Sequence, residues 1–391
     1  MQFNFLLVIS SLIQEEIHKV MGLSIHYATL DWQSFDSISI RKVLEKIPID
    51  KICGLVACGS SDEEYHSQLT KIKSTLYALL GRKVPVTLIP QRILPDNSLT
   101  LEFYTLEGDT AIRFGEMDGV CYGHIESTAE SLLFIEGIPS HDFTESVHQQ
   151  SDEVFAKLNN ILSVFDFEVD DIVRQWNYIG NIVSFRNGKQ NYQEFNDARS
   201  RYYANGSWNN GYPAATGIGT DGEGIIVGGI AFRRADENGV YPIDNPLQVA
   251  AHVYSKSVLV DEAANAVKST PKFERAKLIE SESGVCCFVS GTAAIRGEQS
   301  CKGSAAAEQT LMTIENIDHL VSQENLVRYG CKAYGLEYRK LHVYIKHAED
   351  YAEVRSVVEQ RYQNLNLPVI YSVADVCRDE LLVEIEAILT L

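Results

Sequence analysis

The feature that most constrains the fold of this chain is a structural pattern that occurs three times. Residues 85–106, 213–232 and 368–390 each begin with proline followed by valine or alanine, continue as a short β-rich segment, cross a polar turn and end in a second strand pattern. Apolar residues spaced three and four positions apart predict a helix before the first and last copies, at 63–80 and 348–363. This recurrence indicates a chain assembled from tandem copies of one unit.

A second repeated element supports the first. Apolar strands that run into a glycine turn occur at 132–140 and 286–295. Each precedes an amphipathic helix pattern and then another strand, at 146–165 and 172–182 in the middle of the chain and at 305–323 and 341–346 near its end. The N-terminal copy is more degraded. The alternative is a chance echo, since a helix followed by a proline-led strand is common in α/β proteins.

We therefore expect an α+β fold in which each unit packs its helices on one face of a mixed β-sheet. The units are expected to span residues 1–112, 113–265 and 266–391. A chain of 391 residues can bury such cores without disulfides. Its eight cysteines form no CxxC pair and no Cys/His spacing typical of zinc. We expect reduced thiols, no metal site and a cytoplasmic protein.

The charge balance restricts the partners. With 34 Lys and Arg against 53 Asp and Glu, the net charge is −19, which excludes holding nucleic acid or an anionic membrane through the overall field. An anionic ligand would need a few local Arg or Lys residues. No apolar run is long enough to span a bilayer. The apolar residues 3–13 lack the flanks of a signal peptide, so we expect a buried strand there or a true start further on, for example at Met21.

Two carboxylates stand in an apolar segment near the C-terminus, LLVEIEAI at 381–388. In a strand, Glu384 and Glu386 share one face, while Val383 and Ile385 point to the other. A carboxyl group held among apolar groups has a raised pKa and can act as a general acid near neutral pH. The alternative is an exposed edge strand with two solvated glutamates.

Other residues are candidates on chemistry alone. Tyr192 and Arg199 are seven residues apart, so on a helix they face one side, where a guanidinium could grip a carboxylate. Gly291 stands at a strand end, where the lack of a Cβ lets a ligand approach the backbone. Cys377 lies in the polar loop before Glu384. The alternatives are a surface arginine, a simple tight turn and a small core cysteine.

Short segments in the last two thirds of the chain resemble known families. The segments CFVSGTAAI, EQTLMTIENI and LLVEIEAI resemble the RidA (YjgF) fold, whose members are trimers with ligand sites between subunits. The segments RQWNYIGNI, YQEFNDAR and YPAATGIGT resemble the chorismatase family, whose members look like a RidA trimer fused into one chain. The resemblance covers about residues 110–391. It implies a pseudo-trimeric monomer with its active site between the central and C-terminal units.

The resemblance also implies an activity and roles for residues. Chorismate, a small dianion with an enol-pyruvyl ether, would be the substrate, and no metal or redox cofactor would be needed. Glu384 would protonate the enol ether so that pyruvate is released. Tyr192, Arg199 and Lys346 would hold the carboxylates, although the family usually has arginine at the position of Lys346. Tyr254 would line the pocket, in a stretch where this sequence departs from the family pattern.

The product is predicted from two further positions. Members that aromatise the ring tend to carry the residues found here as Gly291 and Cys377, whereas hydrolysing members carry alanine at both. The resemblance thus implies 3-hydroxybenzoate and pyruvate as products. The alternatives are hydrolysis to a dihydroxycyclohexadiene carboxylate, formation of 4-hydroxybenzoate, and a RidA-like binding protein without catalysis. An imine deaminase is disfavoured because the strand PVIYSVAD lacks the arginine used by RidA.

Overall fold

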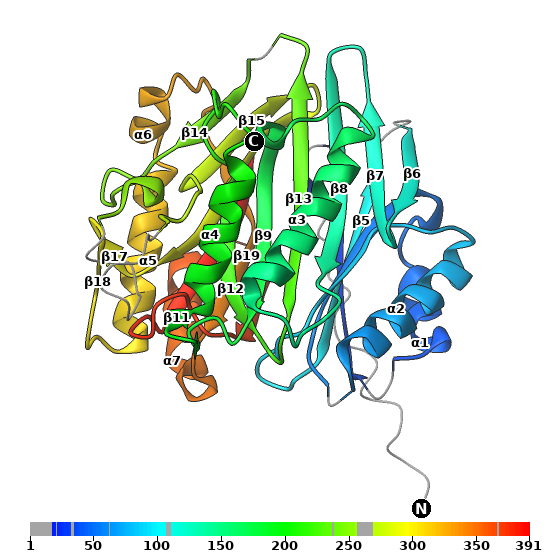
Figure 1. The fold of residues 1–391 in the computed structure, drawn as a ribbon, viewed down its shortest axis with the longest axis horizontal. Coiled ribbons are helices and arrows are strands. Elements are labelled where there is room, and N and C mark those ends of the chain that lie inside the picture. The colour runs from blue at the N-terminus through cyan, green and yellow to red at the C-terminus, as the bar shows by residue number, and fades with distance from the viewer. Residues whose placement is uncertain are drawn as a thin grey trace, which may run out of the picture.

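The structure is a computed structural model that describes residues 18–20, 22–32, 35–61, 63–106, 111–236, 238–255, 269–365 and 367–391. The apolar segment 3–13 and the boundary expected near 265 lie outside these residues. Three large mixed sheets of five, six and six strands make up the molecule, and helices flank them (Figure 1).

The N-terminal sheet has the strand order β1-β2-β5-β3-β4. Its elements are β1 (His18–Val20), β2 (Leu23–Leu30), α1 (Ser37–Leu44), β3 (Ile52–Cys58), α2 (Tyr65–Leu80), β4 (Val86–Ile89) and β5 (Leu99–Leu106). Helix α2 begins where the Glu64 carboxylate accepts from the backbone N–H groups of His66 and Ser67, and it ends at Gly81, whose φ of 67° is left-handed.

The central sheet has the order β12-β9-β13-β8-β7-β6. Its elements are β6 (Ile112–Met117), β7 (Val120–Glu126), β8 (Glu130–Pro139), α3 (Val147–Ser163), β9 (Ile172–Gly180), α4 (Asn191–Tyr203), β12 (Ala214–Thr220) and β13 (Ile225–Arg234). A small hairpin, β10 (Phe185–Arg186) and β11 (Lys189–Gln190), leads into α4.

The C-terminal sheet has the order β14-β15-β16-β21-β19-β20. Its elements are β14 (Val240–Ile243), β15 (Ala276–Ser281), β16 (Gly284–Ala293), α5 (Ala306–Leu320), α6 (Gln323–Arg328), β19 (Glu337–Ile345), α7 (Tyr351–Tyr362), β20 (Val369–Val373) and β21 (Val383–Thr390). A second small hairpin, β17 (Ile295–Arg296) and β18 (Gln299–Ser300), follows β16.

All three sheets share one connection pattern. The strands before and after one helix pair in parallel, namely β3 with β4, β9 with β12 and β19 with β20. The last strand of each unit then lies antiparallel in the middle of its sheet, as β5, β13 or β21. The α+β class and the predicted element order are confirmed, and the N-terminal copy follows the same order. Strand β14 precedes the boundary expected near 265 yet pairs in the C-terminal sheet, and the domain limits stay a prediction.

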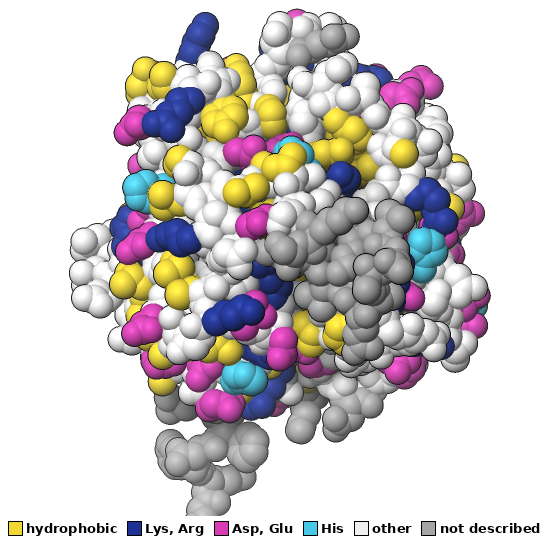
Figure 2. Space-filling view, turned by 60° about the vertical axis from the view of Figure 1, so that its left-hand side comes forward, with side chains coloured by type: hydrophobic (Ala, Val, Ile, Leu, Met, Phe, Trp, Pro, Cys, Tyr) yellow, Lys and Arg dark blue, Asp and Glu magenta, His cyan; other side chains and the backbone are white. Residues whose placement is uncertain are grey.

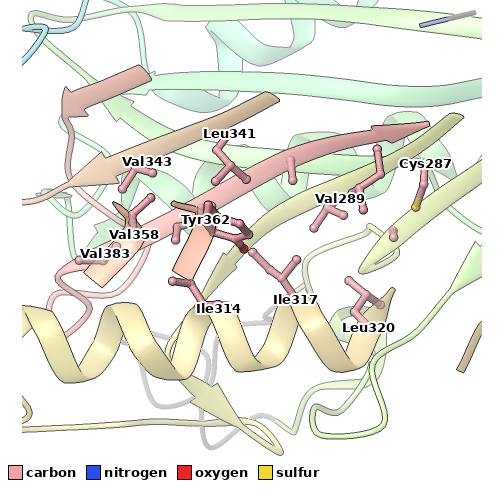
Figure 3. Packing of buried hydrophobic residues seen from close by; sticks show 14 of the residues in the cluster. Cys287, Val289, Ile314, Ile317, Leu320, Leu341, Val343, Val358, Tyr362 and Val383 are labelled. Atoms are coloured by element: carbon pink, nitrogen blue, oxygen red, sulfur yellow. The ribbon is translucent and has the colours of Figure 1, made fainter. Parts of the chain in front are cut away.

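Helices cover one face of each sheet, and the other faces meet inside the molecule. In the C-terminal unit, Ile314 and Ile317 of α5 and Val358 of α7 pack on Val343 and Val383 of the sheet (Figure 3). On the inner side, one apolar cluster contains residues of all three sheets, among them Cys58, Tyr178 and Tyr344. The inner faces of the strands therefore line the boundaries between units, where a site can form.

Two global expectations can be compared with the structure. Within the described ranges, no helix combines the length and the apolar character needed to cross a membrane. The eight cysteines are all free thiols, and six of them are buried.

Candidate active site

One cavity lies between the central and C-terminal sheets and brings together most of the residues predicted from the sequence. Helix α4 and strand β12 form one wall, and strands β16 and β21 form the other. The predicted residues that line it are Tyr192, Arg199, Tyr254, Gly291, Cys377 and Glu384. Lys346 is not among the lining residues.

Glu384 is a buried carboxyl group on the inner face of β21. This strand is internal, between β16 and β19, so the alternative of a solvated edge strand is excluded. Burial raises the pKa of Glu384 to about 8, the negative charge of Glu386 adds to the shift, and the Arg275 and Arg174 guanidinium groups oppose it. The side chain therefore keeps its proton at neutral pH and can donate it.

Gly291 lies directly against this carboxyl group. It occupies a bulge in the pairing of β16 with β21, between Val289 and Thr292. A Cβ at position 291 would be 1.9 Å from Glu384 Oε1, so only glycine leaves the carboxyl group its present place. The Gly291 N–H donates to Thr216 Oγ1 at 3.1 Å, which fixes the bulge to β12 of the central unit.

Arg199 is a buried cation without an acidic partner. Its side chain is 1% exposed, donates to Asn196 Oδ1 at 2.6 Å and leaves Nε without a partner. No carboxylate of the described residues lies within ion-pair distance of it. Tyr192, two turns earlier on α4, also faces the cavity, and burial raises its pKa, so the phenol stays protonated. A buried guanidinium of this kind is suited to an anionic ligand.

Two further arginines line the cavity, and neither was predicted from the sequence. Arg275 is 3% exposed, donates to the Val249 carbonyl at 2.8 Å and to the Tyr254 hydroxyl, and leaves Nε unpartnered. Arg378 donates to the Glu298 carbonyl at 2.9 Å. Both guanidinium groups lie over the Tyr254 ring, at 5.6 and 5.3 Å from its centroid. Arg378 directly follows Cys377 in the sequence, a signal that could have revealed it.

The cavity is therefore positive although the protein is acidic. Its charged lining consists of Arg199, Arg275, Arg378 and the Glu384 carboxyl group, which is neutral when protonated. On the face shown in Figure 2, Asp and Glu side chains are interspersed with Lys and Arg. The attraction for an anion is local, provided by guanidinium groups in the cavity.

Comparisons with known proteins agree with this geometry. Residues 105–231 match the family model described as chorismatase FkbO/Hyg5-like, N-terminal. The chain is 30% identical to a 3-hydroxybenzoate synthase of Streptomyces hygroscopicus over 72% of its own length and 79% of that protein. The chain belongs to the chorismatase family. It is also 32% identical to a chorismatase of Streptomyces rapamycinicus over 56% of its length and 63% of that protein. A chorismatase crystal structure matches with a TM-score of 0.69 and 20% identity, over 95% of this chain and 99% of that one.

In this member of the chorismatase family, two of the predicted site residues, Cys377 and Lys346, have different surroundings. Burial raises the pKa of Cys377 to about 12, with the nearby Glu384 charge adding to the shift, so its sulfur is a thiol rather than a thiolate. The ammonium group of Lys346 donates to both the carbonyl and the Oδ1 of Asp379, at 2.6 Å each. The structure thus brings Cys377 to the cavity and leaves Lys346 outside it.

Proposed function

We propose that this enzyme converts chorismate into 3-hydroxybenzoate and pyruvate, with Glu384 as the general acid. The observation that supports this most strongly is the cavity itself, where a neutral carboxyl group faces the buried Arg199 and Arg275, whose Nε atoms have no hydrogen-bond partner among the described residues. The names of the two Streptomyces relatives point to the same chemistry.

The arginines that line the cavity can bind the substrate. Chorismate carries two carboxylates, and Arg199 and Arg275 each have an unpartnered Nε in this cavity. Each can donate charge-assisted hydrogen bonds to one carboxylate. Arg378 adds a third positive charge, and the Tyr192 hydroxyl can donate to either carboxylate. In this proposal Arg275 takes the role that the family resemblance implied for Lys346.

The reaction needs one proton donor and a dry cavity. Glu384 gives its proton to the methylene carbon of the enol ether, whose π electrons form the new C–H bond and leave an oxocarbenium ion. If the neighbouring ring hydroxyl, instead of water, attacks the ring carbon that bears the activated ether, a new C–O bond forms as the bond from that carbon to the ether oxygen breaks, and pyruvate leaves with the ether oxygen as its carbonyl. The three-membered C–O–C ring that remains then opens and keeps its oxygen as a hydroxyl group. Loss of a ring proton then makes the ring aromatic and restores the acid. The two products together contain all the atoms of chorismate.

Water exclusion decides the product, and two positions bear on it. Gly291 lets Glu384 stand close to the backbone, and Cys377 contributes a protonated thiol to the lining. Both residues match the aromatising members of the family. Neither supplies a base that would activate water at neutral pH.

The proposal is tested by incubating purified protein with chorismate and separating the products by chromatography, with pyruvate measured by a coupled dehydrogenase assay. Equal amounts of 3-hydroxybenzoate and pyruvate support it. The non-aromatic diol or 4-hydroxybenzoate as the product would refute the product assignment. A rise in melting temperature with chorismate but no pyruvate would identify a binding protein instead.

Both walls of the cavity come from one chain, so we also propose that the enzyme acts as a monomer whose units are arranged as a pseudo-trimer. A molecular mass measured by light scattering that matches a trimer of chains would contradict this.

A further inference from the structure

A buried charged cluster lies directly behind Glu384 and has no role in the reaction proposed above. Glu386 follows on the same face of β21, and its Oε2 accepts from Arg174 NH2 at 2.6 Å and from Thr216 Oγ1 at 2.5 Å. Its Oε1 accepts from Trp176 Nε1 at 3.3 Å. Because Arg174 is on β9 and Thr216 is on β12, this cluster joins the two units that form the cavity.

The hydroxyl of Thr216 connects this cluster to the acid. It donates to Glu386 and accepts both from Arg174 NH2 at 2.7 Å and from the Gly291 N–H at 3.1 Å. A hydroxyl has one hydrogen to donate and two lone pairs, so its hydrogen-bonding capacity is full. Gly291 is in turn the residue whose backbone lies against Glu384. A continuous path of polar contacts therefore runs from Arg174 to the wall that holds the acid.

We propose that Glu386, held between Arg174 and Thr216, is a positioning residue that keeps Glu384 in place and in its proton-donating state. This inference rests on the proposed role of Glu384 as general acid. Two effects carry it. The anchored Thr216 fixes the bulge at Gly291 against Glu384, and the negative charge on the same strand face opposes ionisation of its neighbour.

Glu386 must be ionised for the second effect. Burial pulls the pKa of Glu386 upward, but the positive charges of Arg174 and Lys340 and the Thr216 hydrogen bond outweigh it and lower the pKa overall. Burial lowers the pKa of His342 to about 3, so this imidazole is neutral. Other titratable and charged groups line the two cavities beside these carboxyls or interact with them. Among the described residues they are Cys53, Cys58, Glu102, Tyr104, Glu136, Arg174, Tyr178, Tyr192, Arg199, Tyr254, Arg275, Lys340, His342, Tyr344, Cys377 and Arg378.

The repeat supplies an internal comparison. In β21 and β19, Glu384 pairs with Tyr344, and in β13 and β9, Ile226 pairs with Tyr178. Both tyrosines belong to the same inner cluster, so Ile226 occupies the position equivalent to that of the acid. There, too, a glycine N–H donates to a threonine, from Gly137 to Thr87 Oγ1 at 2.8 Å.

This second arrangement has the threonine and the glycine, but isoleucine at the position equivalent to Glu384. A Cβ at Gly137 would lie 2.8 Å from Ile226, as one at Gly291 would meet Glu384. The hydrogen bond by itself thus serves to join units. A buried Glu102–Lys340 ion pair of 2.7 Å, between β5 and β19, likewise joins units away from the acid. Thr87 and Glu102 are therefore matched controls for Thr216 and Glu386.

The first experiment measures kcat/KM for chorismate against pH in wild type and in Glu386→Gln, with Glu102→Gln as the control. We expect the alkaline limb, where activity falls as Glu384 loses its proton, to move down by about one pH unit or more in Glu386→Gln. Glu386→Asp keeps the negative charge, so its alkaline limb should lie close to that of the wild type. Glu102→Gln should leave the limb where it is, even if its melting temperature falls.

The second experiment compares Thr216→Val with Thr87→Val. Both variants lose the hydrogen bond from a glycine N–H. Thr216→Val also loses the contacts with Arg174 and Glu386, so its melting temperature should fall further than that of Thr87→Val. Only Thr216→Val should lower kcat, on the order of tenfold, because it frees the wall behind the acid. Thr216→Ser should retain most of the wild-type kcat.

The outcomes separate this inference from the proposed function. The infrared carbonyl band of protonated Glu384, identified by its loss in Glu384→Gln, reports its titration without turnover. A wild type that makes no pyruvate, with that band still titrating lower in Glu386→Gln, would refute the function and keep the effect of Glu386. An unchanged alkaline limb and band in Glu386→Gln, with equal kcat in the two valine variants, would overturn the inference.

Discussion

Replacing Gly291 by alanine tests how closely the backbone holds the acid. The new Cβ would lie 1.9 Å from Glu384 Oε1, whereas an ordinary contact begins near 3.4 Å, so the carboxyl group must move by about 1.5 Å. Thr216 Cγ2 would lie 3.2 Å from the same Cβ, which limits retreat toward β12. A misplacement of about 1 Å can cost on the order of 10²-fold in rate. We expect a loss of that size in kcat for Gly291→Ala, with KM changing less.

The assay is steady-state pyruvate release, together with chromatography of the ring products. The displaced carboxyl group should also admit water, so the share of non-aromatic diol should rise. Gly297→Ala is a suitable control for the added methyl group, because no atom lies within 4 Å of a Cβ built there, although its φ of 59° will cost some stability. Wild-type kcat and product ratio in Gly291→Ala would show that the contact with Glu384 has no bearing on catalysis.

Three further predictions follow from the charges. Arg275→Met should raise KM for chorismate about tenfold or more by removing a buried charged donor, whereas Lys346→Met, whose ammonium group pairs with Asp379, should change KM little. Because Glu384 must be protonated, kcat/KM should fall as pH rises through about 8; a profile flat to pH 10 would contradict this. The pKa of Glu384 is about 8 in the folded state and 4.5 ordinarily. Between these pH values the carboxyl group ionises only in the unfolded state, so stability falls as pH rises. Glu384→Gln should thus stabilise the ligand-free protein at pH 7, by about 3 kcal/mol, and by much less at pH 5, as measured by denaturant unfolding.

Much of the fold could be predicted from the sequence because strands and helices each have a characteristic spacing of apolar residues. Alternation in LLVEIEAI places Val383 and Ile385 under the helices and Glu384 on the inner face, and the structure confirms that pattern. The spacing of Tyr192 and Arg199 similarly puts both on one side of α4. These features depend only on the geometry of one strand or one helix.

The rest of the site depends on contacts between distant segments. Arg275 and Arg378 are far apart in sequence, and in the folded chain both pack against Tyr254 in one cavity. Lys346 stands at the end of β19, where the position suggests a pocket, but its side chain turns to Asp379 in the loop before β21. No local sequence pattern predicts whether the Lys346 ammonium group will bind a substrate carboxylate or pair with Asp379.

The hydrogen bond from the Gly291 N–H to Thr216 could not be predicted from the sequence either. It joins β12 to β16 across the boundary of two units, and neither residue carries a charge that would mark it in the sequence. Thr87 and Gly137 make the same contact between β4 and β8, which only the structure shows. The roles of the site residues and the cytoplasmic location stay predictions.

The proton donor is the part of the account on which all else depends, and Glu384→Gln tests it most directly. This variant keeps the size of the side chain and removes only the transferable proton. With chorismate binding confirmed by calorimetry, pyruvate release at pH 7 should fall on the order of 10²–10⁴-fold. Release at the wild-type rate by the folded, substrate-binding variant would contradict the assignment of Glu384 as the acid.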